Sequence, residues 1–360
     1  MTDLRIQNLA RILVRYSIEA RKGQTVGVRS STAGEPLVTA VAEELLRAGA
    51  FPALRMAPDG YEELLFRRGK PVHFDTIPPF DKAYARTVDS TIVIRAETNT
   101  RALSSVSPKR QMQLGRTMKP VWDTLRSKPW VITVFPTAAY AQDAEMSLTE
   151  YEHFVFGATF ADADRPVGAW RRLHRRQQRL IDKLQGADRI RIVSDDTDLT
   201  LSVKGRTFIN SDGHRNMPSG EIFTSPVETS ADGYIRYNFP VCRSGREITG
   251  IRLVFRKGVV VEATAEKNQA FLRAALDTDK GARRLGELGI GANTGIQRFT
   301  RHILFDEKIG GSVHLAVGQS FTEAGGRNRS ALHWDMIKDL RQGGAIYVDG
   351  KLFQKDGRFR

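Results

Sequence analysis

The residues that could do chemistry gather in two short stretches near the end of the chain. They are two histidines and three acidic residues: Asp306, Glu307, His314, His333 and Asp335. In His333-Trp334-Asp335 the two ligand types stand two positions apart, so an extended backbone turns both to one side and Trp334 to the other. Imidazole suits zinc, cobalt, nickel or iron, whereas carboxylates suit manganese and magnesium. The pattern predicts a metal site, and a mixed set of this kind can hold two divalent ions that share a carboxylate.

Two more carboxylates, Glu221 and Glu287, stand upstream, and each follows a glycine. Glycine lets the backbone come close to whatever the carboxylate holds. Further glycines follow Glu287, but their spacing fits neither the dinucleotide fingerprint nor the Walker pattern, because no Gly-Lys-Ser/Thr sequence is present. We therefore expect tight turns near a metal, rather than a nucleotide site, at Gly286, Gly289, Gly291 and Gly295.

The composition indicates a soluble globular protein. With 360 residues, of which 41% are apolar and 27% charged, the chain is long enough for two domains that each bury a core. No apolar run approaches the roughly 20 residues that span a membrane, and the first residues lack the pattern of a secretory signal. Cys242 is the one cysteine, which excludes an intramolecular disulfide and fits a reducing compartment. We therefore expect a cytoplasmic protein with no membrane partner.

The net charge of +14 raises the question of nucleic acid, since a basic surface attracts phosphates. The densest basic run has helical spacing with apolar residues between the charges; its members are Arg171, Arg172, Arg175, Arg176, Arg179 and Lys183. A solvated helix face explains this run, and no aromatic platform or DNA-binding signature accompanies it. We therefore predict no nucleic-acid partner.

The elements that must position the candidate ligands fall into two groups. In the N-terminal part the patterns predict a strand, a helix and a second strand, at Thr25–Arg29, residues 36–48 and Phe51–Met56. Parallel strands need such a helical crossover, so this part is predicted to be an α/β layered domain. Further buried strands are expected at Ser90–Ala96 and Trp130–Phe135, and Ser147 with Glu150 predicts a capping box for a following helix.

After Gly186 the pattern changes to short strands joined by turns. The predicted strands are Arg189–Ser194, Leu199–Val203, Glu247–Arg256 and Val259–Thr264. Such spacing is typical of an antiparallel, hairpin-rich sheet, here with one amphipathic helix at Gln269–Leu276. We therefore predict an α/β protein with an N-terminal α/β layered domain at residues 1–187 and an α+β catalytic domain at residues 188–360.

Several segments, taken in order, make the chain resemble the thermophilic metallo-aminopeptidase family typified by aminopeptidases T and S. The main ones are Asn216–Glu221, Glu287–Asn293, Leu304–His314 and Asn328–Asp335. The resemblance is weakest over residues 57–120, and it extends outward to Pro136–Ala141, Asp196–Ser202 and Tyr347–Phe353. Motifs of this length are specific because all of them must occur in the same order.

The resemblance implies a homodimer whose C-terminal domain removes N-terminal amino acids from peptides by means of a water molecule activated by two metals. By motif, the two ions, which would be zinc, cobalt or manganese, are held by Glu221, Glu287, His314, His333 and Asp335. Glu307 looks like an additional acidic site residue, and together with Glu221 and Glu287 it makes the set of predicted catalytic carboxylates. One carboxylate would take a proton while the metals polarise the scissile carbonyl. Lys308 either stabilises charge near the site or pairs with Asp306.

One segment, Gly318–Gly325, departs from the resemblance. The family's peptidases carry a tyrosine and a proline there, where this chain has Phe321 and Thr322. A tyrosine hydroxyl would donate a hydrogen bond to the developing oxyanion, and removal of such a donor costs roughly 10²–10³ in rate. Phenylalanine cannot donate, so we expect weak peptidase activity, a substitute donor such as Tyr234 or Tyr237, or different chemistry. Phe321 and Tyr234 are also the predicted residues of the substrate pocket.

This departure leaves two alternatives open. A dihydroxypyridine ring-cleaving dioxygenase group resembles the same family, and there a single Fe(II) is held by two histidines and an aspartate. His333, Asp335 and either His314 or His302 could form such a triad. Against this alternative, both upstream glutamates are retained, and an iron triad does not need them. The other alternative is a catalytically reduced metal-binding homologue of peptidase descent, since one fold hosts several chemistries.

Overall fold

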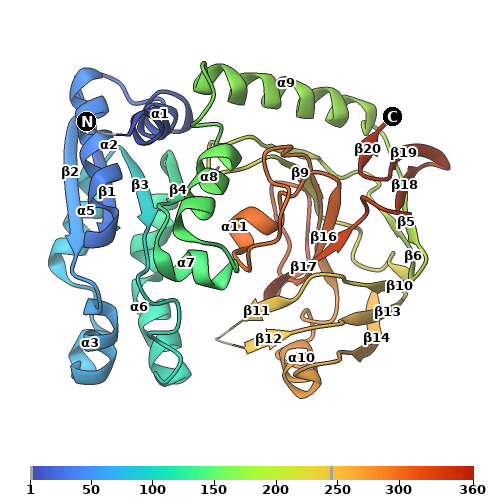
Figure 1. Cartoon of the computed structure of the whole chain (residues 1–360). Helices are drawn as coiled ribbons and strands as arrows, with labels where there is room; N and C mark the ends of the chain where they lie inside the picture. Colours follow the sequence, from blue (N-terminus) through green and yellow to red (C-terminus); the bar gives the residue numbers. More distant parts are fainter. Residues whose placement is uncertain (1–2, 244–245) are drawn as a thin grey trace. The chain divides into compact units, whose positions relative to one another are not determined.

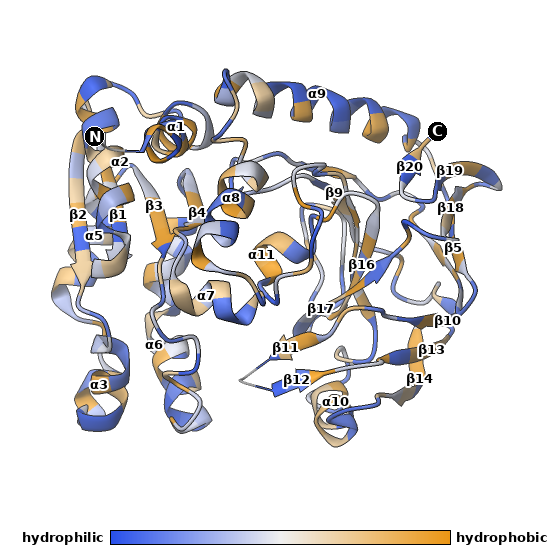
Figure 2. Cartoon of the chain, viewed as in Figure 1, coloured by the Kyte–Doolittle hydropathy of each residue, from blue (hydrophilic) through white to orange (hydrophobic). Residues whose placement is uncertain are grey.

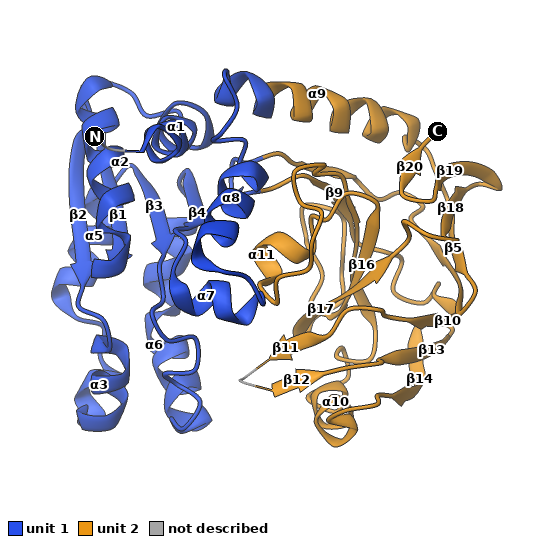
Figure 3. Cartoon of the chain, viewed as in Figure 1, with its two compact units in different colours: residues 1–170, 213–218 blue, residues 171–212, 219–360 orange. Residues whose placement is uncertain are grey.

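The structure is a computed structural model that describes residues 3–243 and 246–360. Figure 1 shows the chain, which forms two compact units (Figure 3). Unit 1 comprises Met1–Trp170 and Gly213–Pro218, and unit 2 comprises Arg171–Asp212 and Ser219–Arg360. All of the candidate ligands named above belong to unit 2.

The change from unit 1 to unit 2 falls inside one helix, α9 (Pro166–Lys183). The sequence predicts a boundary near residue 187, where the helical pattern ends and the strands begin. Because the helix continues through Trp170 and Arg171, the local pattern carries no signal at the place where the units divide. The domain ranges 1–187 and 188–360 stay a prediction.

Unit 1 is built on a parallel sheet with the strand order β2-β1-β3-β4-β8. Its strands are β1 (Thr25–Ser31), β2 (Phe51–Ala57), β3 (Ser90–Arg95), β4 (Trp130–Val134) and β8 (Asn216–Met217). The predicted β-α-β unit is confirmed, since helix α2 (Glu35–Arg47) connects β1 to β2. Strand β8 was not predicted, because it comes from a part of the chain that otherwise builds unit 2.

The other helices of unit 1 complete the α/β layered domain that the sequence predicts. They are α1 (Leu4–Ile12), α3 (Tyr61–Arg68), α4 (Pro71–Asp75), α5 (Pro79–Thr87), α6 (Pro108–Arg126), α7 (Ala138–Asp143) and α8 (Leu148–Ala158). The predicted capping box begins α8: the Ser147 hydroxyl accepts from the Glu150 amide, and the Glu150 carboxylate accepts from the Ser147 amide. Across the described residues, no helix is both long and apolar enough to cross a membrane.

Unit 2 contains two larger antiparallel sheets, as the hairpin pattern predicts. The eight-stranded sheet, with the order β14-β13-β10-β6-β5-β18-β19-β20, is formed by β5 (Arg189–Ser194), β6 (Thr197–Ser202), β10 (Asp232–Arg236), β13 (Arg252–Arg256), β14 (Val259–Thr264), β18 (Ala345–Val348), β19 (Lys351–Lys355) and β20 (Arg358–Phe359). The five-stranded sheet, with the order β17-β16-β15-β9-β7, is formed by β7 (Ile209–Ser211), β9 (Glu221–Thr224), β15 (Leu285–Gly291), β16 (Ser312–Gly318) and β17 (His333–Asp339).

Two short helices and one small hairpin accompany these sheets. They are α10 (Gln269–Leu276), α11 (Ile303–Asp306) and the strands β11 (Val241–Arg243) and β12 (Arg246–Ile248). The prediction of one strand at Glu247–Arg256 is wrong, because β12 ends at Ile248 and β13 starts at Arg252. Gly250 lies between them with a φ of 61°, a left-handed conformation that breaks a strand.

The core of unit 2 lies between the two sheets. In the five-stranded sheet, alternate residues face this core, and Leu288, Leu315, Trp334 and Met336 are all buried in it. Strand side chains alternate between the two faces of a sheet, so the residues in between point to the other face. That other face carries the candidate ligands.

Candidate metal centre

The five ligands that the family resemblance implies stand on one face of the five-stranded sheet, and each has a glycine or alanine as one of its cross-strand neighbours. The pairs are Glu221 with Gly291, Glu287 with Ala316, His314 with Gly289, His333 with Gly318, and Asp335 with Ala316. Directly opposed side chains lie close together in an antiparallel pair, so a large neighbour would fill the space that the ligands need. The prediction that His333 and Asp335 share one side is confirmed, since Trp334 between them is buried in the core.

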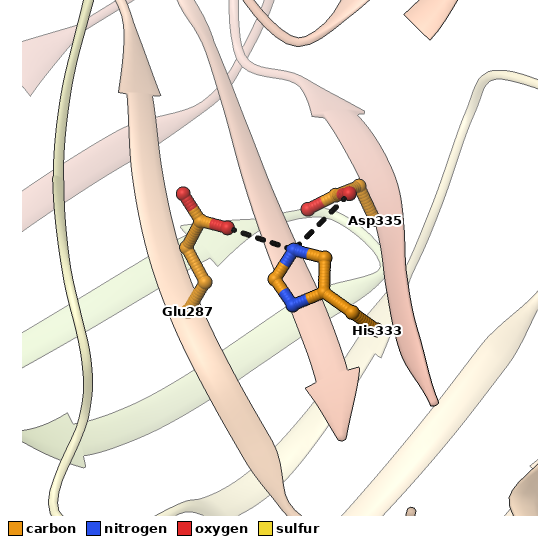
Figure 4. A group of neighbouring side chains, drawn as sticks. All are labelled: Glu287, His333 and Asp335. Atoms are coloured by element: carbon orange, nitrogen blue, oxygen red, sulfur yellow. Dashed lines mark ion pairs between the residues drawn. The ribbon is translucent and has the colours of Figure 1, made fainter. Parts of the chain in front are cut away.

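Glu287 lies between two imidazoles. One of its oxygens is 3.3 Å from Nε2 of His333, which is also 3.5 Å from the carboxylate of Asp335 (Figure 4). Its other oxygen is 3.5 Å from Nε2 of His314, and the same nitrogen is 3.5 Å from the carboxylate of Glu221. Strands β9, β15, β16 and β17 therefore bring five residues that are far apart in sequence to one place.

Both histidines are held through their other ring nitrogen. Nδ1 of His333 is 2.8 Å from the carbonyl oxygen of Gln319, and Nδ1 of His314 is 3.1 Å from that of Glu307. When Nδ1 donates to a carbonyl, Nε2 is the nitrogen left with a lone pair for a metal. Each imidazole is thus oriented toward the carboxylates.

Two groups of side chains offer ligand atoms within 4.8 Å of one another, and they share one residue. The first group is Glu287, His333 and Asp335, and the second is Glu307, His314 and Asp335. In the described residues, Oδ1 of Asp335 and Oε2 of Glu221 are buried and accept no hydrogen bond. Buried oxygens without a donor are costly, and a cation would satisfy them. The residues present therefore fit a divalent metal.

Lys308 resolves an alternative that the sequence leaves open. Its side chain is fully buried, lies 3.3 Å from the carboxylate of Glu221 and makes a close ion pair with Glu307. It therefore neutralises charge at the site and does not pair with Asp306. Oδ1 of Asp306 accepts from the amide and the hydroxyl of Thr300, and burial raises the pKa of Asp306 to about 7.

The charged side chains of the cluster shift one another's pKa values. Burial alone would raise the pKa of Glu287, but its bonds to His314 and His333 hold that pKa well below the usual value. Burial alone would lower the pKa values of both histidines, yet the carboxylates raise both, and that of His333 reaches about 9. Burial and the charge of Glu287 raise the pKa of Asp335. In the absence of metal, the site therefore holds protons.

We expect the affinity for a divalent metal to rise with pH because of His333. A metal binds the neutral imidazole, so below its pKa of about 9 the ion must displace a proton. The apparent association constant should rise at least about tenfold per pH unit between about pH 6 and pH 8, since His333 alone accounts for one displaced proton. Zinc titrations against a competing chelator measure this slope, and calorimetry in buffers of different ionisation enthalpy measures the proton released. A flat affinity over this range would contradict the protonated site.

Gly289 makes room for His314. It is the cross-strand neighbour of His314, and a Cβ added to it would overlap the imidazole ring. We therefore expect Gly289→Ala to push His314 away from the carboxylates and to weaken metal binding roughly 10- to 100-fold, the usual cost of disturbing the support of a metal ligand. Metal titration of the variant measures the loss. Gly115→Ala in α6, where an added Cβ meets nothing within 4 Å, is the matched control and should bind metal normally.

The glycines beside the carboxylates serve protein packing. A Cβ on Gly220 would overlap Asn293, and a Cβ on Gly286 would overlap the carbonyl of Gln319. From the sequence we expect these glycines to let the backbone approach whatever the carboxylates hold. In the structure they instead allow two segments of the backbone to pack closely together. The expectation of tight turns is wrong for Gly286, Gly289 and Gly291, which lie within strand β15, and is confirmed for Gly295, which lies in a turn.

The predicted substrate-pocket residues lie in different places. The ring of Phe321 packs edge-on against the His333 ring at 5.3 Å and lies 5.1 Å from that of Phe223. Tyr234 is in the other sheet, on β10, where it is 37% exposed and its ring lies 5.2 Å from the Arg252 guanidinium. Phe321 thus contacts a candidate ligand directly, and Tyr234 contacts a surface arginine.

Tyr237, which the sequence offers as a substitute donor, is buried. Among the described residues its hydroxyl has no hydrogen-bond partner. Burial raises its pKa, and the negative charge of Asp335 raises it further, so the hydroxyl stays protonated near this carboxylate. Tyr237 belongs to the buried core of unit 2, and Asp335 is the site residue whose charge acts on its hydroxyl.

Helix α9 contributes a residue that the sequence reasoning missed. Gln177 is fully buried, and its side-chain nitrogen lies 2.9 Å from the carbonyl oxygen of Glu221. Arg176 of the basic run donates to the carbonyl of Ala292 at 2.6 Å, so this run is in part structural. Figure 2 shows hydrophilic and hydrophobic residues alternating along the turns of α9. A glutamine at an apolar position of that pattern was the available signal.

Comparison with known proteins identifies the family to which the chain is similar. The thermophilic metalloprotease family (M29) matches residues 2–359 of this chain. Aminopeptidase T of Thermus thermophilus is 27% identical, over 96% of this chain and 95% of its own length. Aminopeptidase 2 of Geobacillus stearothermophilus is also 27% identical, over 88% of this chain and 84% of its own length.

A solved structure, wild-type AmpT from Thermus thermophilus, has the same fold. Its TM-score is 0.86 at 23% sequence identity, and the match covers 99% of this chain and 98% of that one. The predicted fold class, an α/β domain followed by a hairpin-rich domain, is confirmed. The comparisons give no support to the ring-cleaving dioxygenase alternative. Because the family match runs through nearly the whole chain and includes every candidate ligand, the chain belongs to the thermophilic metalloprotease family M29, and it is a hydrolase.

Proposed function

We propose that this chain is a metal-dependent aminopeptidase that uses two divalent metal ions to remove N-terminal amino acids from peptides. The observation that carries the proposal is the pair of ligand groups that share Asp335: Glu287, His333 and Asp335 lie on the sheet, and the second group adds His314 of the sheet and Glu307, which follows α11. A carboxylate shared between two groups that each contain an imidazole suits a pair of divalent ions. The family match and the relatives named aminopeptidases support the reaction.

The residues that would hold the ions come from four neighbouring strands. They are Glu221, Glu287, His314, His333 and Asp335. Nitrogen and oxygen donors in this mixture suit zinc, cobalt or manganese. When bound, two such ions lower the pKa of a water molecule and polarise the scissile carbonyl of a peptide.

The glutamates have different roles in this proposal. Glu287 is held between both imidazoles, and Glu221 beside Lys308. Glu307 has the most exposed side chain of the three, at 15% against 6% for Glu221 and 7% for Glu287. We assign proton transfer to Glu307, because a general base must reach the substrate and Glu307 is the most exposed of the three carboxylates.

The proposal extends to partners and location. The family resemblance supports a homodimer that acts on peptides, and the single cysteine fits a cytoplasmic location. We propose no nucleic-acid partner, since the basic residues of α9 include one bound to the protein itself.

The proposal is tested by metal content and hydrolysis together. Protein purified without added metal is analysed by plasma mass spectrometry, stripped with a chelator and reloaded with zinc, cobalt or manganese. We expect two ions per chain and release of arylamine from aminoacyl arylamides that stops on stripping and returns on reloading. Hydrolysis that survives complete stripping would contradict the proposal. So would a single ferrous ion per chain with oxygen uptake on a dihydroxypyridine.

A further inference from the structure

A small cavity lies beside the candidate ligands. Its volume is about 220 Å³, and His333 and Asp335 form part of its wall. The remaining wall includes the apolar side chains of Phe299 and Ile303 and two arginines, Arg243 and Arg301. Sites for drug-sized ligands usually measure about 300–1,000 Å³, so this cavity suits one side chain or one chain end of a substrate. The proposed function makes no use of the arginines.

Arg243 is held at the cavity by one hydrogen bond, and among the described residues its other N–H donors make none. Its Nη1 donates to the carbonyl of His333 at 2.9 Å, and the guanidinium lies 5.5 Å from the centre of the Trp334 ring. A guanidinium has five N–H donors, and within the described structure this carbonyl is the one acceptor that Arg243 contacts. The other donors are available to a planar anion such as a carboxylate.

Arg301 is the second arginine of the cavity wall. Its Nε is 3.1 Å from the carboxylate of Glu247, and that carboxylate is also 3.2 Å from Nζ of Lys267. The carboxylate of Glu247 thus contacts two positively charged side chains, Arg301 and Lys267. Arg301 has a φ of 60°, a conformation that is uncommon for a residue with a side chain and that recurs at functional sites.

The acidic groups of the cavity do not cancel this charge. Asp306 is turned toward Thr300, whose amide and hydroxyl both donate to its Oδ1. Asp335 belongs to the proposed metal ligands, so its charge is directed to the ions. A carboxylate that enters the cavity would therefore meet Arg243 and Arg301 next to the ligands.

We infer that this cavity binds a carboxylate of the peptide substrate between Arg243 and Arg301. Arginine and carboxylate form paired hydrogen bonds whose geometry gives specificity as well as energy. The carboxylate is either an acidic side chain on the N-terminal residue or the C-terminal carboxylate of a short peptide, because both are anions within reach of the scissile bond. This inference rests on the proposed function and names the substrate class of the same site.

The kinetic test compares substrates that differ in one charge. Glutamyl and glutaminyl arylamides test a side-chain carboxylate, whereas leucylglycine and its amide test a C-terminal carboxylate. For one of these pairs we expect wild type to prefer the acid in kcat/KM, and Arg243→Gln to lower that preference about 10- to 100-fold, mainly through KM, as for lost hydrogen bonds to a charged group. Arg243→Lys should keep part of the preference, because lysine retains the charge but not the fork.

The matched control is Arg256→Gln. Arg256 is an exposed arginine on β13 that pairs with Asp232 away from the cavity, and its loss should leave both preferences unchanged. The pair that responds to Arg243→Gln identifies the source of the carboxylate, and a response in either pair supports the inference. Equal kcat/KM for acid and amide in both pairs, unchanged by Arg243→Gln, would overturn it and leave the aminopeptidase proposal standing.

A binding measurement separates this inference from the proposed function and from misfolding. Calorimetry measures the Kd of free glutamate, glutamine, leucylglycine and leucylglycine amide for wild type, Arg243→Gln and Arg301→Gln, with the fold of each variant checked by circular dichroism. We expect one acid to bind more tightly than its amide, and either variant that folds to lose that difference. Such binding by a protein that hydrolyses no arylamide would overturn the aminopeptidase proposal and uphold the carboxylate site. Equal binding of acid and amide would overturn the site.

Discussion

His333→Ala and Asp335→Ala are expected to abolish hydrolysis while the chain stays folded. Both side chains lie on the face of the sheet opposite the core of unit 2, and that core is unaffected by their removal. Asp335 is destabilised in its charged form by burial and by Glu287, so its loss removes a repulsion from the metal-free protein. We expect activity to fall at least about 10³-fold, more than the loss of a single oxyanion donor costs.

The two variants should differ in metal content. Asp335 belongs to both ligand groups, whereas His333 belongs to one of them. Asp335→Ala should therefore lose both ions and His333→Ala one. Plasma mass spectrometry counts the ions, arylamide hydrolysis reports activity, and thermal unfolding followed by circular dichroism reports the fold.

His153→Ala is the matched control for these variants. His153 is an exposed histidine of α8 whose ring contacts a backbone carbonyl, so its loss should change neither metal content nor activity. A His333→Ala chain that keeps both ions and full activity would remove His333 from the site. If His333→Ala is unfolded and a chelator does not change the activity of the wild type, His333 has a structural role.

Phe321→Tyr is expected to raise turnover on aminoacyl arylamides, with little change in KM. The Phe321 ring already packs edge-on against His333, so a hydroxyl on this ring adds a donor next to the metal centre. A donor that acts on the developing oxyanion stabilises the transition state more than the bound substrate, and kcat changes rather than KM. The upper limit of the gain is roughly 10²–10³-fold, the usual cost of losing such a donor.

Phe359→Tyr controls for the added hydroxyl. Phe359 is a partly exposed phenylalanine of β20 in the other sheet, where it contacts Phe353. Steady-state kinetics of both variants with zinc, cobalt or manganese give kcat and KM. A Phe321→Tyr enzyme no faster than wild type would mean that another group, such as the buried hydroxyl of Tyr237, already serves as the donor. Tyr237→Phe would then reduce turnover. An unchanged rate for Phe321→Tyr together with a reduced rate for Tyr237→Phe would contradict the hypothesis that the enzyme lacks an oxyanion donor because of Phe321.

The sequence by itself determined the local elements and the kind of chemistry. The β-α-β pattern of unit 1 and the hairpins of unit 2 are visible because side-chain periodicity reports which face of an element is buried. The same periodicity placed His333 and Asp335 on one side of a strand and Trp334 on the other. The density of imidazoles and carboxylates indicated a metal, since folding alone does not require these residues together.

Only the tertiary structure decided which segments meet. Glu221 reaches the site because β9 pairs with β15, and Asp335 because β17 pairs with β16. Neither pairing leaves a mark in the local sequence, because register between distant strands depends on the burial and hydrogen bonds of the whole sheet. For the same reason the partners of Lys308 and the place of β8 in the other unit were not predictable. Each ligand faces a glycine or alanine across the sheet. This pairing can be recognised only when the register is known, because the register decides which small residue leaves space for which ligand.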